Sequence, residues 1–211
     1  MSGTAPQHPR PAARIGRPRG FDRDAALLAA MHVFWTHGYE GTSIQDLVEA
    51  MGVNKPSLYA TFGCKEELFR QAVALYDRTE GLSSSRSLDE APTAREAIES
   101  LLRMNAKAYV AGDRPSGCMI VLASLLGTPE NAEIRAFLAD NRLASEKAVR
   151  DRLDRGVADG ELPPGTATAS LAAFYTTVLE GLSIQARDGA SVAKLHAIID
   201  AAMLAWPPSR D

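Results

Sequence analysis

Residues 42–62 read TSIQDLVEAMGVNKPSLYATF, and this stretch decides the fold of the 211-residue chain. Ile44, Leu47 and Val48 recur at three-to-four spacing, which is typical of one apolar side of a short helix. Gly52 then interrupts the pattern, and helical spacing resumes a few residues later. The stretch predicts a helix-turn-helix, in which the second helix enters the major groove of DNA.

Capping signals mark where the two helices begin. Thr42 and Gln45 stand at capping-box spacing, which predicts that the threonine hydroxyl caps the first helix. Asn54 can cap the second helix, and Pro56 costs little in a first turn. We therefore expect helices over about 43–51 and 54–61.

The second helix has a mostly polar exposed side, made by Asn54, Lys55, Ser57, Tyr59 and Thr61. Hydroxyl, amide and ammonium groups of this kind can meet phosphates and base edges. Two amphipathic helices around a turn also occur in folds that do not bind DNA, so the pattern alone leaves a purely structural reading open.

The flanking segments complete a small helical unit. Asp22 can cap a helix that Gly38 ends, and Gly63 precedes a long helix that begins at Lys65. Later helices are expected at about 93–110, 118–126, 128–159, 166–187 and 191–205, with a polar, serine-rich loop over 81–92. The fold class is all-α with about nine helices.

Four ranges describe the expected domain organisation: a basic flexible arm at 1–20, a three-helix DNA-binding domain at 21–66, a larger C-terminal helical domain at 67–206 and a tail at 207–211. Residues 1–20 contain four arginines and no acid, although the net charge of the chain is −3. A basic arm on a mildly acidic body indicates a nucleic-acid partner, although the net charge alone would disfavour one.

Composition excludes several classes. A content of 45% hydrophobic and 23% charged residues is ordinary for a folded protein. No apolar run approaches the roughly 18 residues of a membrane-spanning helix, and the N-terminus resembles no secretory signal. We expect a cytoplasmic protein with no membrane partner. Two cysteines and four scattered histidines predict no metal site and no cofactor.

The motifs together resemble the N-terminal signature of the TetR/AcrR family of bacterial regulators. The resemblance covers about residues 20–75. Its motifs are Phe34 with GYEGTSIQ at 38–45, MGVNK at 51–55, SLY at 57–59 and FGCKEELF at 62–69. Cys64 departs from the family pattern, which more often has serine or a charged residue there, but a cysteine can replace a serine cap.

The resemblance implies a role for each matching residue. Thr42 or Ser43, Tyr59 and Lys65 are expected to contact phosphates of a double-stranded operator. Lys55, Pro56 and Ser57 are expected to face the bases. The arm that contains Arg17 and Arg19 resembles the basic arm of family members, which lies along DNA, and arginine gains from a narrow minor groove.

One short helix supplies little affinity for DNA, and a symmetric dimer doubles the number of half-sites that are bound, so we expect a homodimer. The resemblance implies that the last two helices of each subunit form the dimer interface. The expected apolar faces are Leu171, Phe174, Tyr175, Val178, Leu179 and Leu182 with Val192, Leu195, Ile198, Ile199 and Met203. The alternative is that these side chains pack within one subunit.

Family members hold a small-molecule effector between the DNA-binding helices and the last two. The expected lining is Met104, Tyr109, Cys118, Met119, Leu122, Leu126, Phe137, Phe174 and Tyr175, and its apolar character suggests a hydrophobic or aromatic effector. Each of these residues can instead be ordinary core.

We expect a repressor that its effector releases from a palindromic operator, and not an enzyme, because no nucleophile elbow, HExxH motif or phosphate loop occurs. Two alternatives stay open. The protein can be an activator, or it can sense oxidants or electrophiles through Cys118, whose place at a helix start beside Arg114 predicts a lowered thiol pKa. A purely architectural helical protein is a weaker rival.

Overall fold

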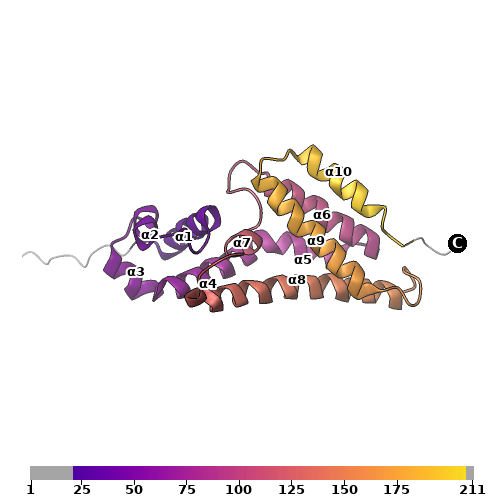
Figure 1. Ribbon diagram of the computed structural model, residues 1–211, viewed down its shortest axis with the longest axis horizontal. Helices are drawn as coiled ribbons and strands as arrows, with labels where there is room; N and C mark the ends of the chain where they lie inside the picture. The colour runs from indigo at the N-terminus through magenta and orange to yellow at the C-terminus, as the bar shows by residue number, and fades with distance from the viewer. Residues whose placement is uncertain (1–20, 208–211) are drawn as a thin grey trace, which may run out of the picture.

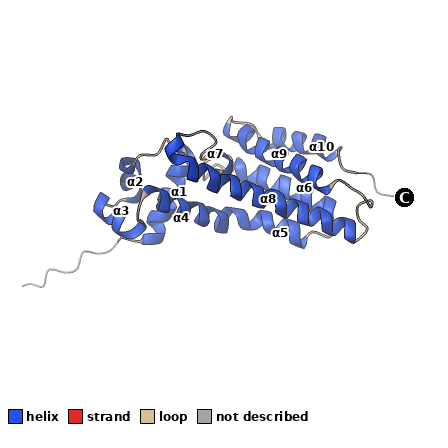
Figure 2. Cartoon of the chain, turned by 60° about the horizontal axis from the view of Figure 1, so that its bottom comes forward, coloured by secondary structure: helices blue, strands red, loops and turns tan. Residues whose placement is uncertain are grey.

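The computed structural model describes residues 21–207, and for residues 82–85 the backbone alone. Within that range every regular element is a helix (Figure 2), which confirms the all-α prediction. The α-helices are α1 (Arg23–His37), α2 (Ile44–Met51), α3 (Lys55–Phe62), α4 (Lys65–Tyr76), α5 (Leu82–Glu90), α6 (Ala94–Tyr109), α7 (Met119–Leu122), α8 (Ala132–Ala158), α9 (Thr168–Arg187) and α10 (Val192–Met203).

The molecule is elongated (Figure 1). Helices α1, α2 and α3 gather at one end, while α6, α9 and α10 form the other. Helix α8 runs along much of the length between them, and α4 leads from the first group toward the second. No helix in the described range is long and apolar enough to cross a membrane.

Local capping fixes the ends of the first helices. The Asp22 carboxylate accepts hydrogen bonds from the backbone N–H groups of Asp24 and Ala25, at 3.0 and 3.2 Å. Gly38 ends α1 with φ of 73°, a backbone that favours glycine. Gly52 ends α2 in the left-handed conformation, and Asn54 then caps α3 through the N–H of Ser57 at 2.8 Å. These predicted caps and stops are confirmed.

The predicted Thr42–Gln45 capping box is wrong, because the cap lies one residue later. The Ser43 hydroxyl accepts from the N–H of Asp46 at 3.1 Å, and the Asp46 carboxylate accepts from the N–H of Ser43 at 2.7 Å. Thr42 is 1% exposed, and its hydroxyl donates to the carbonyl of Gly38 at 2.6 Å.

Cys64 caps α4, as the sequence suggested. Its Sγ accepts from the N–H of Glu67 at 3.5 Å, and the Glu67 carboxylate accepts from the N–H of Cys64 at 2.9 Å. This arrangement is a capping box with sulfur in place of the usual hydroxyl oxygen.

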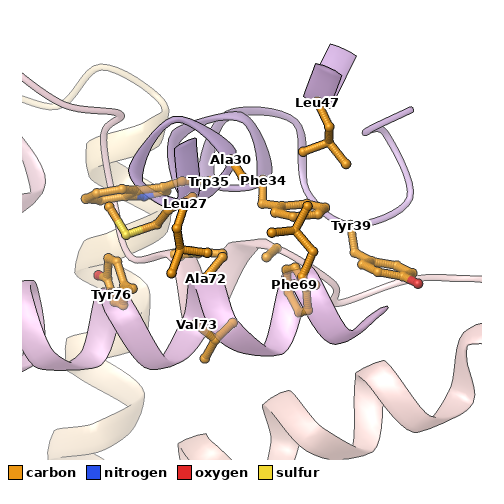
Figure 3. Close-up of a cluster of buried hydrophobic side chains, with 14 of the residues drawn as sticks. Leu27, Ala30, Phe34, Trp35, Tyr39, Leu47, Phe69, Ala72, Val73 and Tyr76 are labelled. Carbon is orange, nitrogen blue, oxygen red and sulfur yellow. The ribbon is translucent and has the colours of Figure 1, made fainter. Parts of the chain in front are cut away.

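The first core joins α1, α2, α3 and α4 (Figure 3), and its members include Leu47, Leu58 and Phe62. Phe34 meets Phe69 edge-on, with ring centroids 5.0 Å apart, and Trp35 meets Tyr76 in the same way at 4.8 Å. The cluster also includes Met119, Ala123, Ile134 and Leu138 from α7 and α8 and the residue that follows α7. The short helices therefore rest on a core that crosses the domain boundary predicted at residue 66.

A second core joins α6, α8, α9 and α10, with Leu102, Leu153, Tyr175 and Leu195 among its fully buried side chains. Cys118 is half-buried and packs against both cores. The start of α7 is therefore the place where the two cores meet.

Two sequence expectations for this half are wrong. The serine-rich segment 81–92 is mostly helix α5, preceded by a π-helical turn at Asp77–Gly81, because Ser87 and Leu88 are buried and packing overrides a weak local propensity. The helix expected over 118–126 ends at Leu122, and Leu125 and Leu126 lie exposed in the following loop.

Candidate nucleic-acid interface and effector cavity

Helix α3 buries one side and exposes the other. Leu58 and Phe62 pack into the first core, while Lys55, Pro56 and Tyr59 are exposed. The Tyr59 side chain is 43% exposed, so it is not a core aromatic. Ser57 is half-buried, and its N–H is bonded to the Asn54 side chain. The exposed side of α3 is free to meet a groove.

Ser43 stands at the start of α2 with its hydroxyl exposed. Its oxygen accepts from the N–H of Asp46. The two hydrogen bonds from Ser43 hold the pKa of the Asp46 carboxyl below its ordinary value. The hydroxyl of Thr42, by contrast, is buried and donates to the carbonyl of Gly38.

Lys65 lies at the start of α4 with its ammonium 4.4 Å from the centroid of the Tyr39 ring. Burial lowers its pKa, while Glu40 and Asp46 act in the opposite direction. The cation–π contact holds the lysine beside the first turn of α4, where backbone N–H groups also favour an anion. Arg17 and Arg19 lie outside the described residues.

Arg23 was not among the residues predicted to contact DNA. Its guanidinium lies 5.1 Å from the centroid of the Phe62 ring and donates to the Gln71 side chain at 2.6 Å. These contacts place an exposed cation beside the C-terminal end of α3. The position of Arg23 directly after the Asp22 cap was the feature of the sequence that could have identified it.

A cavity of about 250 Å³ lies in the C-terminal half, between the two cores. Its walls come from α4, the π-helical turn, α5, α6, α7, α8 and α9. They include Tyr76, Asp77, Glu80, Gly81, Leu88, Leu101, Asn105, Tyr109, Cys118, Ile120, Val121, Asn141, Arg142, Ala144, Ser145, Ala148, Thr176, Leu179 and Glu180. Of the residues predicted to line it, Tyr109 and Cys118 lie in its wall.

The other predicted lining residues lie elsewhere. Leu126 is 88% exposed, and Met104 and Phe174 are also exposed. Met119 and Tyr175 are fully buried in the first and second core, respectively. Leu122 borders a surface hollow beside the end of α1, and Phe137 packs beneath the guanidinium of Arg70 at 4.6 Å.

Cys118 lines the cavity, and nearby Tyr76, Tyr109, Ile120 and Val121 act to lower the pKa of its thiol. Burial nevertheless raises the pKa of Cys118 above its ordinary value. The predicted lowering is wrong, because Arg114 pairs with Glu80 and Asp113.

Residues 117–123, here called the α7 segment, connect the cavity to the DNA-binding helices. The Trp35 indole N–H donates to the carbonyl of Gly117 at 3.1 Å, and the N–H of Tyr39 donates to the carbonyl of Ala123 at 2.7 Å. The N–H of Cys118 donates to the Ser183 hydroxyl at 2.8 Å. The same segment therefore contacts α1, the cavity and α9.

Arg187 makes a second connection between the two ends of the molecule. Its guanidinium, at the end of α9, donates to the carbonyls of Trp35 and Thr36 at 2.8 and 3.3 Å. These carbonyls belong to the last turn of α1, where a cation is favourable.

The apolar residues expected at a dimer interface divide into two sets. Tyr175, Leu179, Leu182, Leu195, Ile199 and Met203 are buried within the subunit, contrary to the expectation that they face a partner. Phe174 and Val192 are exposed, and Leu171, Val178 and Ile198 are half-buried. Ile184 is also exposed, and it borders a surface hollow with Val178 and Ile198.

No group of three or more histidine, cysteine or acidic side chains that could hold a metal ion occurs among residues 21–207.

The family described as "Bacterial regulatory proteins, tetR family" matches residues 26–72. The HTH-type transcriptional repressor ComR of Escherichia coli (strain K12) is 37% identical over 91% of this chain and 92% of its own length. The repressor BdcR of the same organism is 30% identical over 86% and 87%.

Among solved structures, the TetR family transcriptional regulator CifR, as a cysteine-substituted variant bound to 26-base-pair double-stranded operator DNA, superimposes with a TM-score of 0.89. It is 48% identical over 91% of this chain and all of that one. The prediction of a regulator that is not an enzyme is confirmed by these relatives. The chain belongs to the tetR family of bacterial regulatory proteins.

Proposed function

We propose that this protein is a repressor that binds a palindromic operator as a homodimer and leaves it when a small effector enters the cavity. The observation that carries the proposal is the exposed polar side of α3 with the Ser43 hydroxyl nearby, at one end of the molecule. The names of ComR and BdcR as repressors support it, as does the operator complex of CifR.

In this proposal Ser43 and Tyr59 donate their hydroxyls to backbone phosphates, and Lys65 adds a charge beside the first turn of α4. Lys55, Pro56 and Ser57 face the base edges. Phosphate contacts fix the position of the helix, while base contacts select the sequence. Arg17 and Arg19, which precede α1, extend the contact into the minor groove.

A matched pair of variants tests the role of Tyr59. Tyr59→Phe removes one hydroxyl, and we expect about a fivefold loss of affinity for operator DNA, the usual effect of one hydrogen bond. Tyr175→Phe makes the same change at a buried hydroxyl that has no hydrogen-bond partner among residues 21–207. Fluorescence anisotropy should show an unchanged affinity for Tyr175→Phe. Equal affinities of both variants and the unmodified protein would remove Tyr59 from the interface.

The dimer is proposed to form through the outer sides of α9 and α10, where Phe174, Ile184 and Val192 are exposed. Ile184→Arg should produce monomers in size-exclusion chromatography with light scattering, because a charge would be buried without a partner. Leu143→Arg, at an exposed leucine of α8, should leave the dimer intact. A monomeric unmodified protein at micromolar concentration contradicts the dimer.

The effector is proposed to be a small molecule with an apolar or aromatic body, because Leu88, Leu101, Val121 and Leu179 line the cavity. It must bind better to a conformation that does not fit two half-sites, since equal affinity for both conformations shifts nothing. The contacts of the α7 segment with α1 provide a route for that difference.

A second candidate function is sensing of electrophiles or oxidants through Cys118. The observation that favours it is the position of Cys118 in the cavity wall. Mass spectrometry after exposure to mild peroxide, combined with DNA binding by Cys118→Ser, tests it. Unchanged release of Cys118→Ser by the oxidant rules it out.

The sign of regulation is tested separately. A repressor lowers expression of a reporter placed behind its operator, and deletion of its gene raises it. The opposite pair of results identifies an activator.

A further inference from the structure

We propose that the cavity takes a small organic cation, a protonated amine with an apolar body, held by Glu180 and Thr176 of α9. The site stands on its own geometry, and the consequence that the amine releases DNA rests on the function proposed above.

Thr176 lines the cavity, and its hydroxyl is buried. It is 5% exposed, and its Oγ1 has no hydrogen-bond partner in the part of the chain that the structure describes. A buried hydroxyl without a partner costs free energy, which a ligand that bonds to it recovers. Thr176 lies one helical turn before Glu180, so both side chains project from the same side of α9 into the cavity.

Glu180 is a half-buried carboxylate in the cavity wall, with no hydrogen bond or ion pair to any described residue. Burial raises its pKa above the ordinary value, Glu146 acts in the same direction and Arg142 opposes them. A carboxylate in partly apolar surroundings is stabilised by a cation that bonds to it directly.

The remaining polar groups of the wall include acceptors that a ligand can use. The Asn141 amide donates to the carbonyl of Phe137 at 2.7 Å, which leaves its oxygen as an acceptor. Arg142 donates to the carbonyl of Ile120 at 3.1 Å. A ligand that brings N–H donors can therefore bond to the Asn141 oxygen as well as to Glu180.

The charged side chains of the cavity wall also favour a cationic ligand. Asp77, Glu80 and Glu180 contribute three carboxylates, while Arg142 is the one cation that lines the described cavity. Arg114 pairs with Glu80 from outside the wall, and the carboxylates of Asp77 and Glu180 have no such ion pair within residues 21–207. The cavity therefore selects against anions.

The size and the rest of the lining define the body of the amine. A volume of about 250 Å³ lies just below the roughly 300–1,000 Å³ typical of pockets for drug-sized ligands. Apolar side chains line much of it, and Tyr76 and Tyr109 add two aromatic rings to the wall. One ring or a short alkyl chain with a terminal ammonium fits these limits.

Three probes of one shape test the charge preference on the full-length, unmodified protein. 4-Phenylbutylamine, 4-phenylbutanol and 4-phenylbutyrate differ in the head group alone, and isothermal titration calorimetry gives their affinities. We expect the amine to bind at least about tenfold more tightly than the alcohol, with the carboxylate weakest. An alcohol or carboxylate that binds as tightly as the amine overturns the inference, and so does a lack of binding by all three.

Substitutions test which side chains of the cavity bind the ammonium group. Glu180→Gln keeps the shape but removes the charge, so it should weaken amine binding about tenfold and leave alcohol binding nearly unchanged. Thr176→Val should weaken amine binding about threefold. Glu146→Gln removes a neighbouring charge outside the wall and should leave the amine bound. Equal effects of Glu180→Gln and Glu146→Gln contradict the assignment of Glu180.

DNA release, measured in parallel by anisotropy, separates this inference from the proposed function. An amine that binds through Glu180 without releasing DNA contradicts the effector role but leaves the cation site standing. An alcohol that binds as tightly as the amine and releases DNA overturns the cation site but supports the effector role.

Discussion

At the scale of single residues, Gly38 joins the DNA-binding helices to the α7 segment. Its φ of 73° and ψ of 174° fall in a region that side chains other than glycine rarely adopt. A Cβ atom here would lie 2.8 Å from the carbonyl oxygen of Ala123, which also accepts from the N–H of Tyr39. Both the backbone conformation and the close approach require glycine.

We therefore predict that Gly38→Ala lowers the free energy of unfolding by about 1–3 kcal/mol. Urea denaturation followed by circular dichroism measures the loss. Gly112→Ala is the control, because nothing lies within 4 Å of a Cβ atom at Gly112 and its φ is not positive. Equal free energies of unfolding of the two variants would show that position 38 does not require glycine.

The reactivity of Cys118 should depend on pH. Because burial raises its pKa, the thiolate that reacts with alkylating agents is scarce at pH 7 and grows as the pH rises beyond the ordinary thiol value of about 8.5. We predict that iodoacetamide labels exposed Cys64 before Cys118 at pH 7, and that Cys118 labelling accelerates at higher pH. Peptide mass spectrometry reads both sites, and equal labelling at pH 7 would contradict the burial of the thiol.

At the scale of elements, the cap of α4 provides a direct test of local energetics. Sulfur is a weaker acceptor than a hydroxyl oxygen, and the Cys64 Sγ lies 3.5 Å from the N–H of Glu67. Cys64→Ser should raise the free energy of unfolding by up to about 1 kcal/mol, and Cys64→Ala should lower it below that of Cys64→Ser by about 1 kcal/mol. Thermal melting orders the three proteins, and an alanine variant as stable as the serine variant would exclude a capping role.

The elements that the sequence predicted well are those with local signals. Asp22, Asn54 and Gly52 each act on neighbouring backbone groups, so their roles can be read from a few residues. Helix α5 has no such signal: its serines favour a loop, and the burial of Ser87 and Leu88 depends on packing partners far away in the sequence. The cap of α2 is Ser43 and not Thr42, because Thr42 is buried and its hydroxyl donates to the carbonyl of Gly38.

The cavity was the least predictable part. Its wall draws one or a few residues from each of seven helical elements, such as Tyr76 of α4, Leu101 of α6 and Glu180 of α9. Apolar spacing identifies the helices but not which of their sides enclose a space. The methionine and aromatic residues chosen from the sequence therefore proved mostly to be core or surface.

At the scale of the whole molecule, the cavity and the DNA-binding helices share the α7 segment. Tyr76 lines the cavity and also packs edge-on against Trp35 of α1. The Trp35 indole in turn donates to the carbonyl of Gly117. A ligand that displaces the wall near Cys118 would therefore move the contacts that hold α1.

Trp35→Phe removes the indole N–H, and we predict that effector binding survives while its effect on operator affinity falls about fivefold, within the usual range of coupling between sites. Trp206→Phe is the control, because Trp206 packs on Tyr175 near the C-terminus. Calorimetry measures effector binding, and anisotropy measures the operator affinity with and without the effector. If the effector lowers the operator affinity of Trp35→Phe as much as that of the unmodified protein, the Trp35 indole N–H does not transmit the effect.

In the proposed dimer, the polar side of α3 enters a DNA groove once in each subunit. Selection of bound sequences by the full-length, unmodified protein from a random duplex library tests this claim most directly. We predict a palindromic consensus whose half-sites are centred about 34–36 Å apart, or a multiple of that distance. A folded protein that enriches no sequence and binds no duplex at low ionic strength would contradict it.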